Sequence, residues 1–140
     1  MTFVDTNVLV YAAAKGAPLG ARARAGLDAL ATREQRSLSR QVLREYLAVM
    51  TRPQTWSNPL PLRQALADAE LLSQRFTILE DGPRVWSELA ALGQHHSFAG
   101  RQVHDANIVA TMLAHKERRL LTFNHADFQR FTGLIELVVP

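Results

Sequence analysis

Short apolar runs alternate along the chain with longer amphipathic segments. The runs that predict strands are Met1–Val4, Phe76–Leu79, Leu120–Phe123 and Ile135–Val139. Apolar positions recurring every three or four residues predict helices over Leu19–Ala31, Gln41–Met50, Leu62–Arg75, Pro83–Gln94 and Gln102–Lys116. Short strands that alternate with helices in this way indicate an α/β fold, with a parallel sheet flanked by helices.

Local signals add boundaries to this pattern. A helix is expected to open directly behind Asp5, Ser39 is expected to cap a second helix, and a short helical piece is expected over Ala126–Phe131. Arg52–Pro61 contains three prolines and is predicted to be a loop, as is the Gly- and His-containing segment Gly93–Gly100.

Size and composition limit the possible chemistry. A chain of 140 residues with 47% hydrophobic content is the size of one ordinary domain, so residues 1–140 are expected to carry one site. The absence of cysteine excludes disulfides, thiolate-bound zinc and a thiol nucleophile, and leaves oxygen and imidazole as metal ligands. No long apolar run is present, so we expect a cytoplasmic protein with no membrane contact.

The charge of the chain adds a weak indication of its partner. The formal net charge is +3, and Lys15 and Lys116 are the only lysines among the 16 basic residues. Arginine pairs bidentately with phosphate, which favours a nucleic acid or an acidic protein as partner. A genome biased toward arginine codons accounts for the same composition.

Asp5, Thr6 and Asn7 follow the first apolar run directly. In open α/β sheets, ligands bind at the carboxyl ends of the strands, which is where Asp5 is expected. The alternative is that Asp5 is a helix N-cap, since Asp, Thr and Asn all satisfy the free N–H groups of a first turn. If Asp5 takes part in chemistry, capping is expected to pass to Thr6 and Asn7.

Glu45 lies on a predicted helix beside Val42 and Val49. A carboxylate among apolar neighbours needs a compensating cation. That cation is either a metal ion or an arginine such as Arg44 or Arg52.

Two later segments carry acids that could join this edge. Asp105 lies in the first turn of the most apolar predicted helix, on the side of Ile108 and Met112, although an aspartate at a helix start is also an ordinary structural choice. Asn124 and Asp127 follow the predicted strand Leu120–Phe123, where polar turn residues are equally ordinary.

Four segments together resemble the PIN-domain ribonucleases, and among them the VapC-type toxins of bacterial toxin–antitoxin pairs. These segments are Val4–Leu9, Ser39–Glu45, His104–Ala106 and Leu121–Phe128. They follow the order of the family over essentially the whole chain. The resemblance implies a single PIN-like domain, a three-layer sandwich in which Asp5, Glu45 and Asp105 form an acidic cluster.

The last segment departs from the family pattern. Many members carry a fourth acid two positions after the threonine that corresponds to Thr122, and this chain has Asn124 there. Either Asp127 takes over the role of the fourth acid or Asn124 acts as a neutral ligand.

Clustered carboxylates repel one another unless protons or cations intervene, and a set of oxygen ligands favours Mg²⁺ or Mn²⁺. Such an ion supports phosphodiester hydrolysis. Our hypothesis is that Asp5 and Asp105 bind the principal metal, that Glu45 binds it or orients the attacking water, and that Asp127 completes the cluster.

Other residues are expected to support this site. Asn7 and Thr122 would hold the carboxylates by hydrogen bonds. Arg101 is a candidate for contact with the RNA backbone, or else a surface arginine. Trp56 either stacks on a base or packs against the domain or a partner.

The resemblance implies RNA as substrate, a cognate antitoxin protein as partner and a homodimer as assembly. A PIN-like domain that binds RNA or protein without cutting, and a housekeeping RNA-processing nuclease, are the alternatives. The His104-Asp105 pair is also found in HD-type phosphohydrolases, which need further histidines. Haloacid-dehalogenase phosphatases need a second acid where this chain has Asn7.

Overall fold

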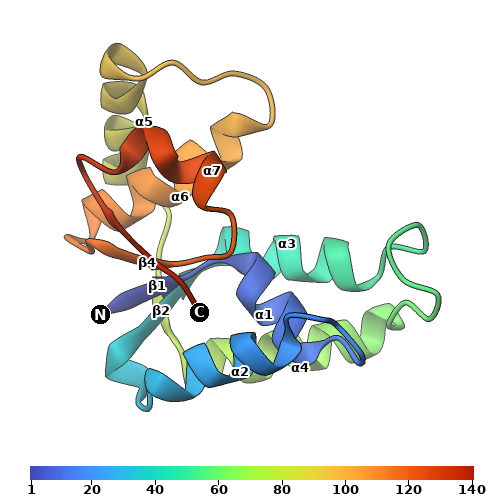
Figure 1. Ribbon diagram of the computed structural model, residues 1–140. Helices are drawn as coiled ribbons and strands as arrows, with labels where there is room; N and C mark the ends of the chain where they lie inside the picture. Colours follow the sequence, from blue (N-terminus) through green and yellow to red (C-terminus); the bar gives the residue numbers. More distant parts are fainter.

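A computed structural model describes all residues 1–140 as a five-stranded parallel sheet between two layers of helices (Figure 1). The strands are β1 (Thr2–Val4), β2 (Arg36–Ser39), β3 (Thr77–Leu79), β4 (Arg119–Leu121) and β5 (Glu136–Val138). The helices are α1 (Thr6–Ala13), α2 (Gly20–Ala29), α3 (Arg40–Met50), α4 (Leu62–Arg75), α5 (Pro83–His95), α6 (Gln102–Ala114) and α7 (His125–Phe128), with 3₁₀ turns η1 (Arg33–Gln35) and η2 (Gln129–Phe131).

The first strand of the chain lies at the centre of the sheet. The strand order is β3-β2-β1-β4-β5, so β1 pairs with β2 on one side and with β4 on the other. The register places Val4 opposite Leu121, and the backbone N–H of Asp5 continues the ladder to the carbonyl of Leu121 at 3.0 Å. Asp5 and Thr122 therefore leave the sheet side by side at the carboxyl ends of their strands.

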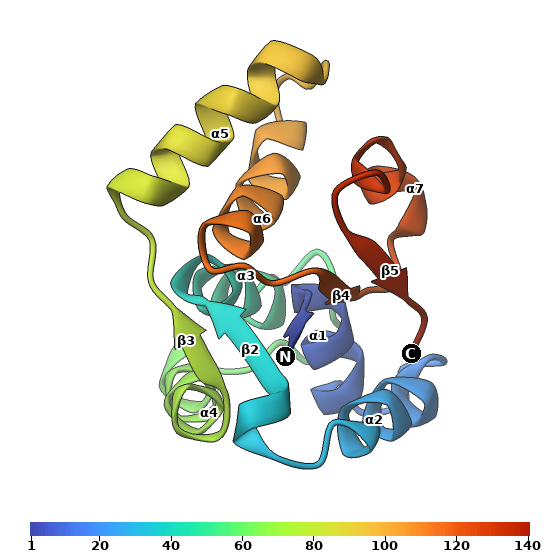
Figure 2. The same ribbon diagram turned by 90° about the vertical axis from the view of Figure 1, so that its left-hand side faces the viewer.

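Helices cover both faces of the sheet. Helices α5, α6 and α7 lie on one side, and α1, α2 and α4 lie on the other (Figure 2). Helix α6 is buried over Ile108, Val109 and Met112, as its sequence predicts. None of the helices has the length and apolar character needed to span a membrane.

Strand β2 is absent from the sequence-based prediction, which assigned no strand to Arg36–Ser39. Its residues are mostly polar, yet Ser37, Leu38 and Ser39 are almost fully buried between β1 and β3. The small serine side chains fit in this position, where the backbone of β2 pairs with a strand on each side. The Arg36 guanidinium lies over the Phe76 ring, 4.6 Å from its centroid. The strand is thus formed by backbone pairing and is not marked by an apolar pattern.

Most predicted helix boundaries are correct within two residues. Helix α6 ends at Ala114, short of the predicted Lys116, because Lys116 adopts a left-handed φ of 61° that a helix cannot continue through. Helix α5 continues to His95 and takes up the first residues of the predicted loop Gly93–Gly100. Arg52–Pro61 is a connection between α3 and α4, as its prolines predict.

Candidate active site

Asp5 lies at the junction of β1 and α1 and is 5% exposed. Its Oδ1 accepts a hydrogen bond from the backbone N–H of Thr6 at 2.8 Å, so Asp5 is the N-cap of α1. The expectation that capping passes to Thr6 and Asn7 is therefore wrong. The two carboxylate oxygens face different partners, which leaves Asp5 able to cap the helix and to face the sheet edge at once.

Thr122 and Asn7 hold the other oxygen of Asp5. The Thr122 hydroxyl donates to Asp5 Oδ2 at 2.7 Å, and the Asn7 amide donates to the same oxygen at 3.0 Å. Asn7 Oδ1 also accepts from the backbone N–H of Phe123 at 3.1 Å, and Thr122 Oγ1 accepts from that of Asn124 at 2.9 Å. These contacts tie α1 to the end of β4.

Glu45 projects from α3 and is held without any arginine. Its Oε2 accepts from the Thr6 hydroxyl at 2.7 Å and its Oε1 from the Gln41 amide at 2.9 Å. It forms no ion pair, so neither Arg44 nor Arg52 is the cation that its apolar surroundings call for.

Sequence reasoning missed the buried residue that joins Glu45 to α6. Gln41 donates to the backbone carbonyl of His104 at 2.8 Å and accepts from the Asn107 amide at 2.8 Å, in addition to its bond to Glu45. A glutamine four residues before the glutamate on one helix face was the available signal. Thr6 was likewise missed as a partner of Glu45.

Asp105 is partly buried at the start of α6, while Asp127 on α7 and Asn124 directly before α7 are exposed. The negative charge of Asp127 raises the pKa of Asp105. The backbone N–H of Asn124 donates a hydrogen bond to the Thr122 hydroxyl. Neither Asp105 nor Asp127 forms an ion pair with a basic side chain.

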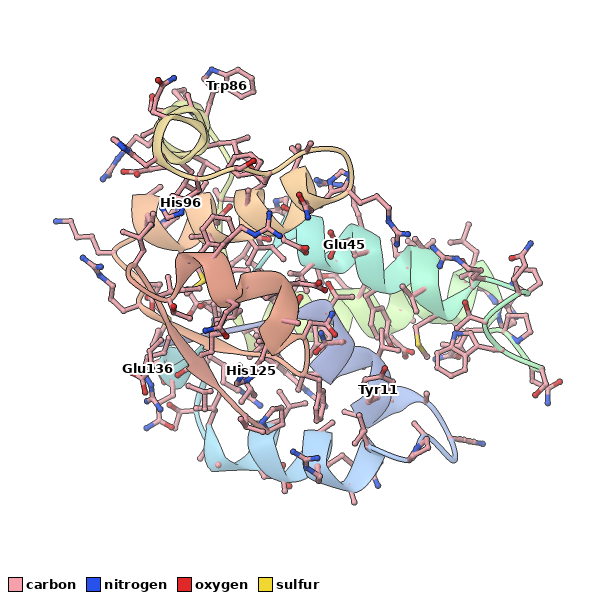
Figure 3. All side chains as sticks on the ribbon, turned by 45° about the horizontal axis from the view of Figure 1, so that its top comes forward. Tyr11, Glu45, Trp86, His96, His125 and Glu136 are labelled. Atoms are coloured by element: carbon pink, nitrogen blue, oxygen red, sulfur yellow. The ribbon has the colours of Figure 1, made fainter.

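These residues face a common cleft of about 730 Å³. Seven of the residues proposed from sequence line it: Asp5, Asn7, Glu45, Arg101, Asp105, Asn124 and Asp127. Thr122 is fully buried behind the wall. Figure 3 shows Glu45 on α3 and Tyr11 on α1, two residues that line this cleft.

Of the five histidines only His104 lines the cleft, which removes the set that an HD-type site would need. Trp56 also lines it and packs against the core, with its indole N–H bonded to the carbonyl of Val49 at 2.7 Å. Trp56 thus packs on its own domain, and it also lines the cleft, so a base could still stack on it.

Two acids of the cleft, Asp5 and Asp105, have raised pKa values. The pKa of Asp5 is raised to about 6, mainly by burial and to a lesser extent by the charges of Glu45 and Asp105. The hydrogen bonds from Thr122 and Thr6 act in the opposite direction and lower it. Burial also raises the pKa of Asp105 to about 6, assisted by the charges of Asp127 and Glu45. Shifts of this kind at a cleft indicate a functional site rather than a solvated surface.

The acids do not form a closed metal cage. No three His, Asp or Glu side chains are arranged so that they alone could hold an ion. Mg²⁺, however, keeps several of its waters and is commonly bound by one or two carboxylates. Carboxylate oxygens with raised pKa values and no basic partner therefore suit a hydrated divalent ion.

Comparison with known proteins decides the family. The family model described as PIN domain matches residues 2–134 of the chain. The chain belongs to the PIN-domain family. The resemblance found in the sequence, the parallel sheet and its flanking helices all agree with this assignment.

This PIN domain is similar to Ribonuclease VapC24 of Mycobacterium tuberculosis, with 28% identity over 133 residues that cover 94% of the chain and 91% of the relative. Its fold matches that of VapBC2 from Rickettsia felis, solved bound to a DNA fragment from their promoter, with TM-score 0.68, 22% identity and coverage of 99% and 98%. It also matches a toxin–antitoxin complex from Klebsiella pneumoniae, with TM-score 0.67, 19% identity and coverage of 99% and 96%.

Proposed function

We propose that the protein is a metal-dependent endoribonuclease and acts as the toxin of a toxin–antitoxin pair. One observation carries the proposal: four carboxylates from separate parts of the chain line one cleft, and no basic side chain forms an ion pair with any of them. The relative named Ribonuclease VapC24 and the toxin–antitoxin complexes of the same fold support the substrate and the role.

Asp5 and Asp105 are the proposed ligands of Mg²⁺ or Mn²⁺. Asp5 is preorganised for this because three donors fix its carboxylate, while Asp105 reaches the cleft from the opposite side of the sheet edge, on α6. The chemistry that such an ion supplies to phosphodiester hydrolysis is activation of water and neutralisation of charge on the phosphate.

Glu45 is the proposed ligand or water-orienting residue. Thr6 and Gln41 hold its two oxygens from behind, so the carboxylate is aimed rather than free to rotate. A carboxylate held in this way can accept a proton from a water that attacks the phosphate.

Asp127 is proposed to complete the cluster in preference to Asn124. Its charge contributes to the raised pKa of Asp105, which indicates that the two carboxylates act on one another. Arg101, which lines the cleft and has no acidic partner, is proposed to contact the RNA backbone.

Cleavage of RNA with and without divalent metal tests the enzymatic proposal. Wild-type protein is expected to cut RNA only when Mg²⁺ or Mn²⁺ is present, and Asp5→Asn and Asp105→Asn are each expected to lower the rate by at least about a hundredfold, as loss of an electrostatic group at a reacting centre does. Asp28→Asn, on exposed α2, is the matched control. Undiminished cleavage by both cleft variants would contradict the assignment of Asp5 and Asp105 as metal ligands.

Growth on expression tests the biological role. A toxin is expected to arrest growth, and both Asp5→Ala and co-expression of a cognate antitoxin are expected to relieve the arrest. Cleavage without arrest would instead favour a housekeeping RNA-processing nuclease. The homodimer implied by the family resemblance stays a prediction, which light scattering measures.

A domain that binds RNA or protein without cutting is the second candidate. The observation in its favour is that no three acidic side chains form a closed metal site. Titration with Mn²⁺ in a calorimeter distinguishes the two, since a domain without a metal site gives no heat that depends on Asp5.

A further inference from the structure

The cleft extends beyond the acidic cluster to a second end of different chemistry. There it is lined by Ala48 and Val49 of α3 and by Trp56 of the following loop, which we call the Trp56 wall. Tyr11 of α1 also lines the cleft, and its ring is held edge-on against Phe123 with 5.5 Å between centroids. The cleft volume of about 730 Å³ lies within the range of small-ligand sites and exceeds what a reacting phosphate alone requires.

Trp56 is held in place before any ligand arrives. Its indole N–H donates to the carbonyl of Val49 at 2.7 Å, and its backbone N–H donates to that of Arg52 at 3.4 Å. The loop closes farther on, where the N–H of Leu60 donates to the carbonyl of Met50 at 2.9 Å. Trp56 is only partly buried and lines the cleft, while the polar atom of its ring is already satisfied by Val49.

Arginines without partners accompany this aromatic surface. Arg52 and Arg101 both line the cleft, and neither forms an ion pair or a side-chain hydrogen bond within the chain. Thr55, from the same loop, also lines the cleft. A flat aromatic surface beside an unpaired guanidinium suits an unstacked base and the phosphate attached to it.

We propose that the Trp56 wall and Arg52 form a base-binding subsite for single-stranded RNA. An unpaired base stacks on Trp56, Arg52 pairs with a neighbouring phosphate, and the strand continues to the acidic cluster. The inference rests on the proposed function, because it places the base next to a phosphate held there for hydrolysis.

The charge pattern favours RNA over an apolar peptide side chain as occupant. A peptide side chain that filled the Trp56 wall would leave Arg52 and Arg101 unpaired, whereas consecutive RNA phosphates give each guanidinium a partner. Stacking also requires no particular base, since every base presents an aromatic face.

Tryptophan fluorescence provides the test. The chain has two tryptophans, and Trp86 is 72% exposed on α5 and outside the cleft, so Trp86→Phe leaves Trp56 as the only reporter. The probes are a short oligoadenylate RNA and an abasic ribose-phosphate oligomer of the same length. The Asp105→Asn background with a chelator allows binding to be measured without cleavage.

Oligoadenylate is expected to quench Trp56 fluorescence, and the abasic oligomer is expected to bind without quenching. Trp56→Ala, tested with labelled RNA in a Trp86-containing background, is expected to weaken binding of oligoadenylate by about 5- to 150-fold and to leave abasic binding unchanged. Trp56→Phe keeps an aromatic ring and is expected to retain part of the affinity. Arg52→Gln is expected to weaken binding of both oligomers alike, and Trp86→Ala is the control without effect.

Equal binding of oligoadenylate by wild type and Trp56→Ala, without quenching, would overturn the subsite and leave an apolar side chain of a protein partner as its occupant. Such a result leaves metal-dependent cleavage by wild type intact. If the wild-type protein cuts no RNA but oligoadenylate still quenches Trp56 fluorescence, the subsite is supported and the proposed nuclease function is contradicted.

Discussion

The single carboxylate of Asp5 both caps a helix and accepts hydrogen bonds at the edge of the sheet. One oxygen caps α1 through the N–H of Thr6, and the other accepts from Thr122 and Asn7 at the sheet edge. Capping and burial both favour a fixed carboxylate, but burial opposes its charge. The result is a group that is rigid and costly to ionise without a cation.

The raised pKa of Asp5 makes part of the stability depend on pH. Because the native pKa of about 6 exceeds the ordinary 3.8, the native protein holds this proton to higher pH than the unfolded chain does. The contribution of the protonated Asp5 to the free energy of unfolding is fully present below pH 3.8 and is lost as the pH rises through about 6. At pH 7 the loss is on the order of 3 kcal/mol in the absence of metal.

Comparing Asp5→Asn with wild type isolates this contribution. In urea unfolding with a chelator, the free energy of unfolding of the variant minus that of wild type is expected to rise between about pH 4 and pH 6 and to stay constant above that range. Asp28→Asn controls for removal of a charge elsewhere. A difference independent of pH would contradict the proposed cost of ionising Asp5.

Thr122 stabilises the same carboxylate from a fully buried position. Thr122→Val keeps the shape but removes the hydroxyl that donates to Asp5 and accepts from the N–H of Asn124. We expect the free energy of unfolding to fall by about 1–3 kcal/mol, the usual cost of buried polar groups left without partners. Thr122→Ser, which keeps the hydroxyl, is expected to recover most of the loss, and equal stability of Val and wild type would refute the role.

At the scale of elements, the site depends on how α3 and α6 are joined. Gln41 is 8% exposed and connects its own helix to α6 through His104 and Asn107 while it holds Glu45. One side chain thus fixes both the position of a candidate catalytic group and the packing of the helix that carries Asp105.

Gln41→Met tests this connection. The change keeps the length of the side chain but removes three hydrogen bonds, so we expect a loss of about 1–3 kcal/mol in unfolding free energy and a lower rate of RNA cleavage. The matched control is Gln74→Met, because Gln74 pairs with Glu70 at the same four-residue spacing on the exposed face of α4. That variant is expected to stay within about 0.5 kcal/mol of wild type.

The sequence predicted the elements that have a side-chain pattern and missed those that do not. Amphipathic α3 and apolar α6 were placed almost to the residue, since their burial repeats with the helical period. Strand β2 was missed because Ser37 and Ser39 are buried by backbone pairing with two neighbours, a contact that no local pattern records.

The same limit applies to the site. The acids were selected by their places at predicted strand ends and helix faces and by the family resemblance, whereas Gln41 and Thr6 are neutral residues whose roles depend on what lies opposite them in space. The capping role of Asp5 was misassigned because the sequence does not say that its two oxygens face different partners.

At the scale of the whole molecule, the cleft gathers negative charge that only folding brings together. Asp5, Glu45, Asp105 and Asp127 come from four separate parts of the chain. A cation that binds only the folded arrangement stabilises it by mass action, by about 2.7 kcal/mol at a hundred times its Kd.

Thermal unfolding with Mg²⁺ or Mn²⁺ measures this linkage. The wild-type Tm at pH 7.5 is expected to rise with metal concentration, and the double variant Asp5→Asn/Asp105→Asn is expected to show no rise. At pH 5 the gain in the wild type is expected to shrink, because protons compete for the same oxygens. A rise of equal size in the double variant would place the metal elsewhere.

The central position of β1 has a consequence for synthesis on the ribosome. Strand β1 cannot acquire its β4 partner until residues near 120 have emerged, and the Thr122 hydroxyl that fixes Asp5 comes just after. A chain made only as far as α5 therefore holds Asp5 and Glu45 but lacks Asp105, Asp127 and one of the two neighbours of β1. The acidic cluster is therefore complete only after α6, β4 and α7 have been made.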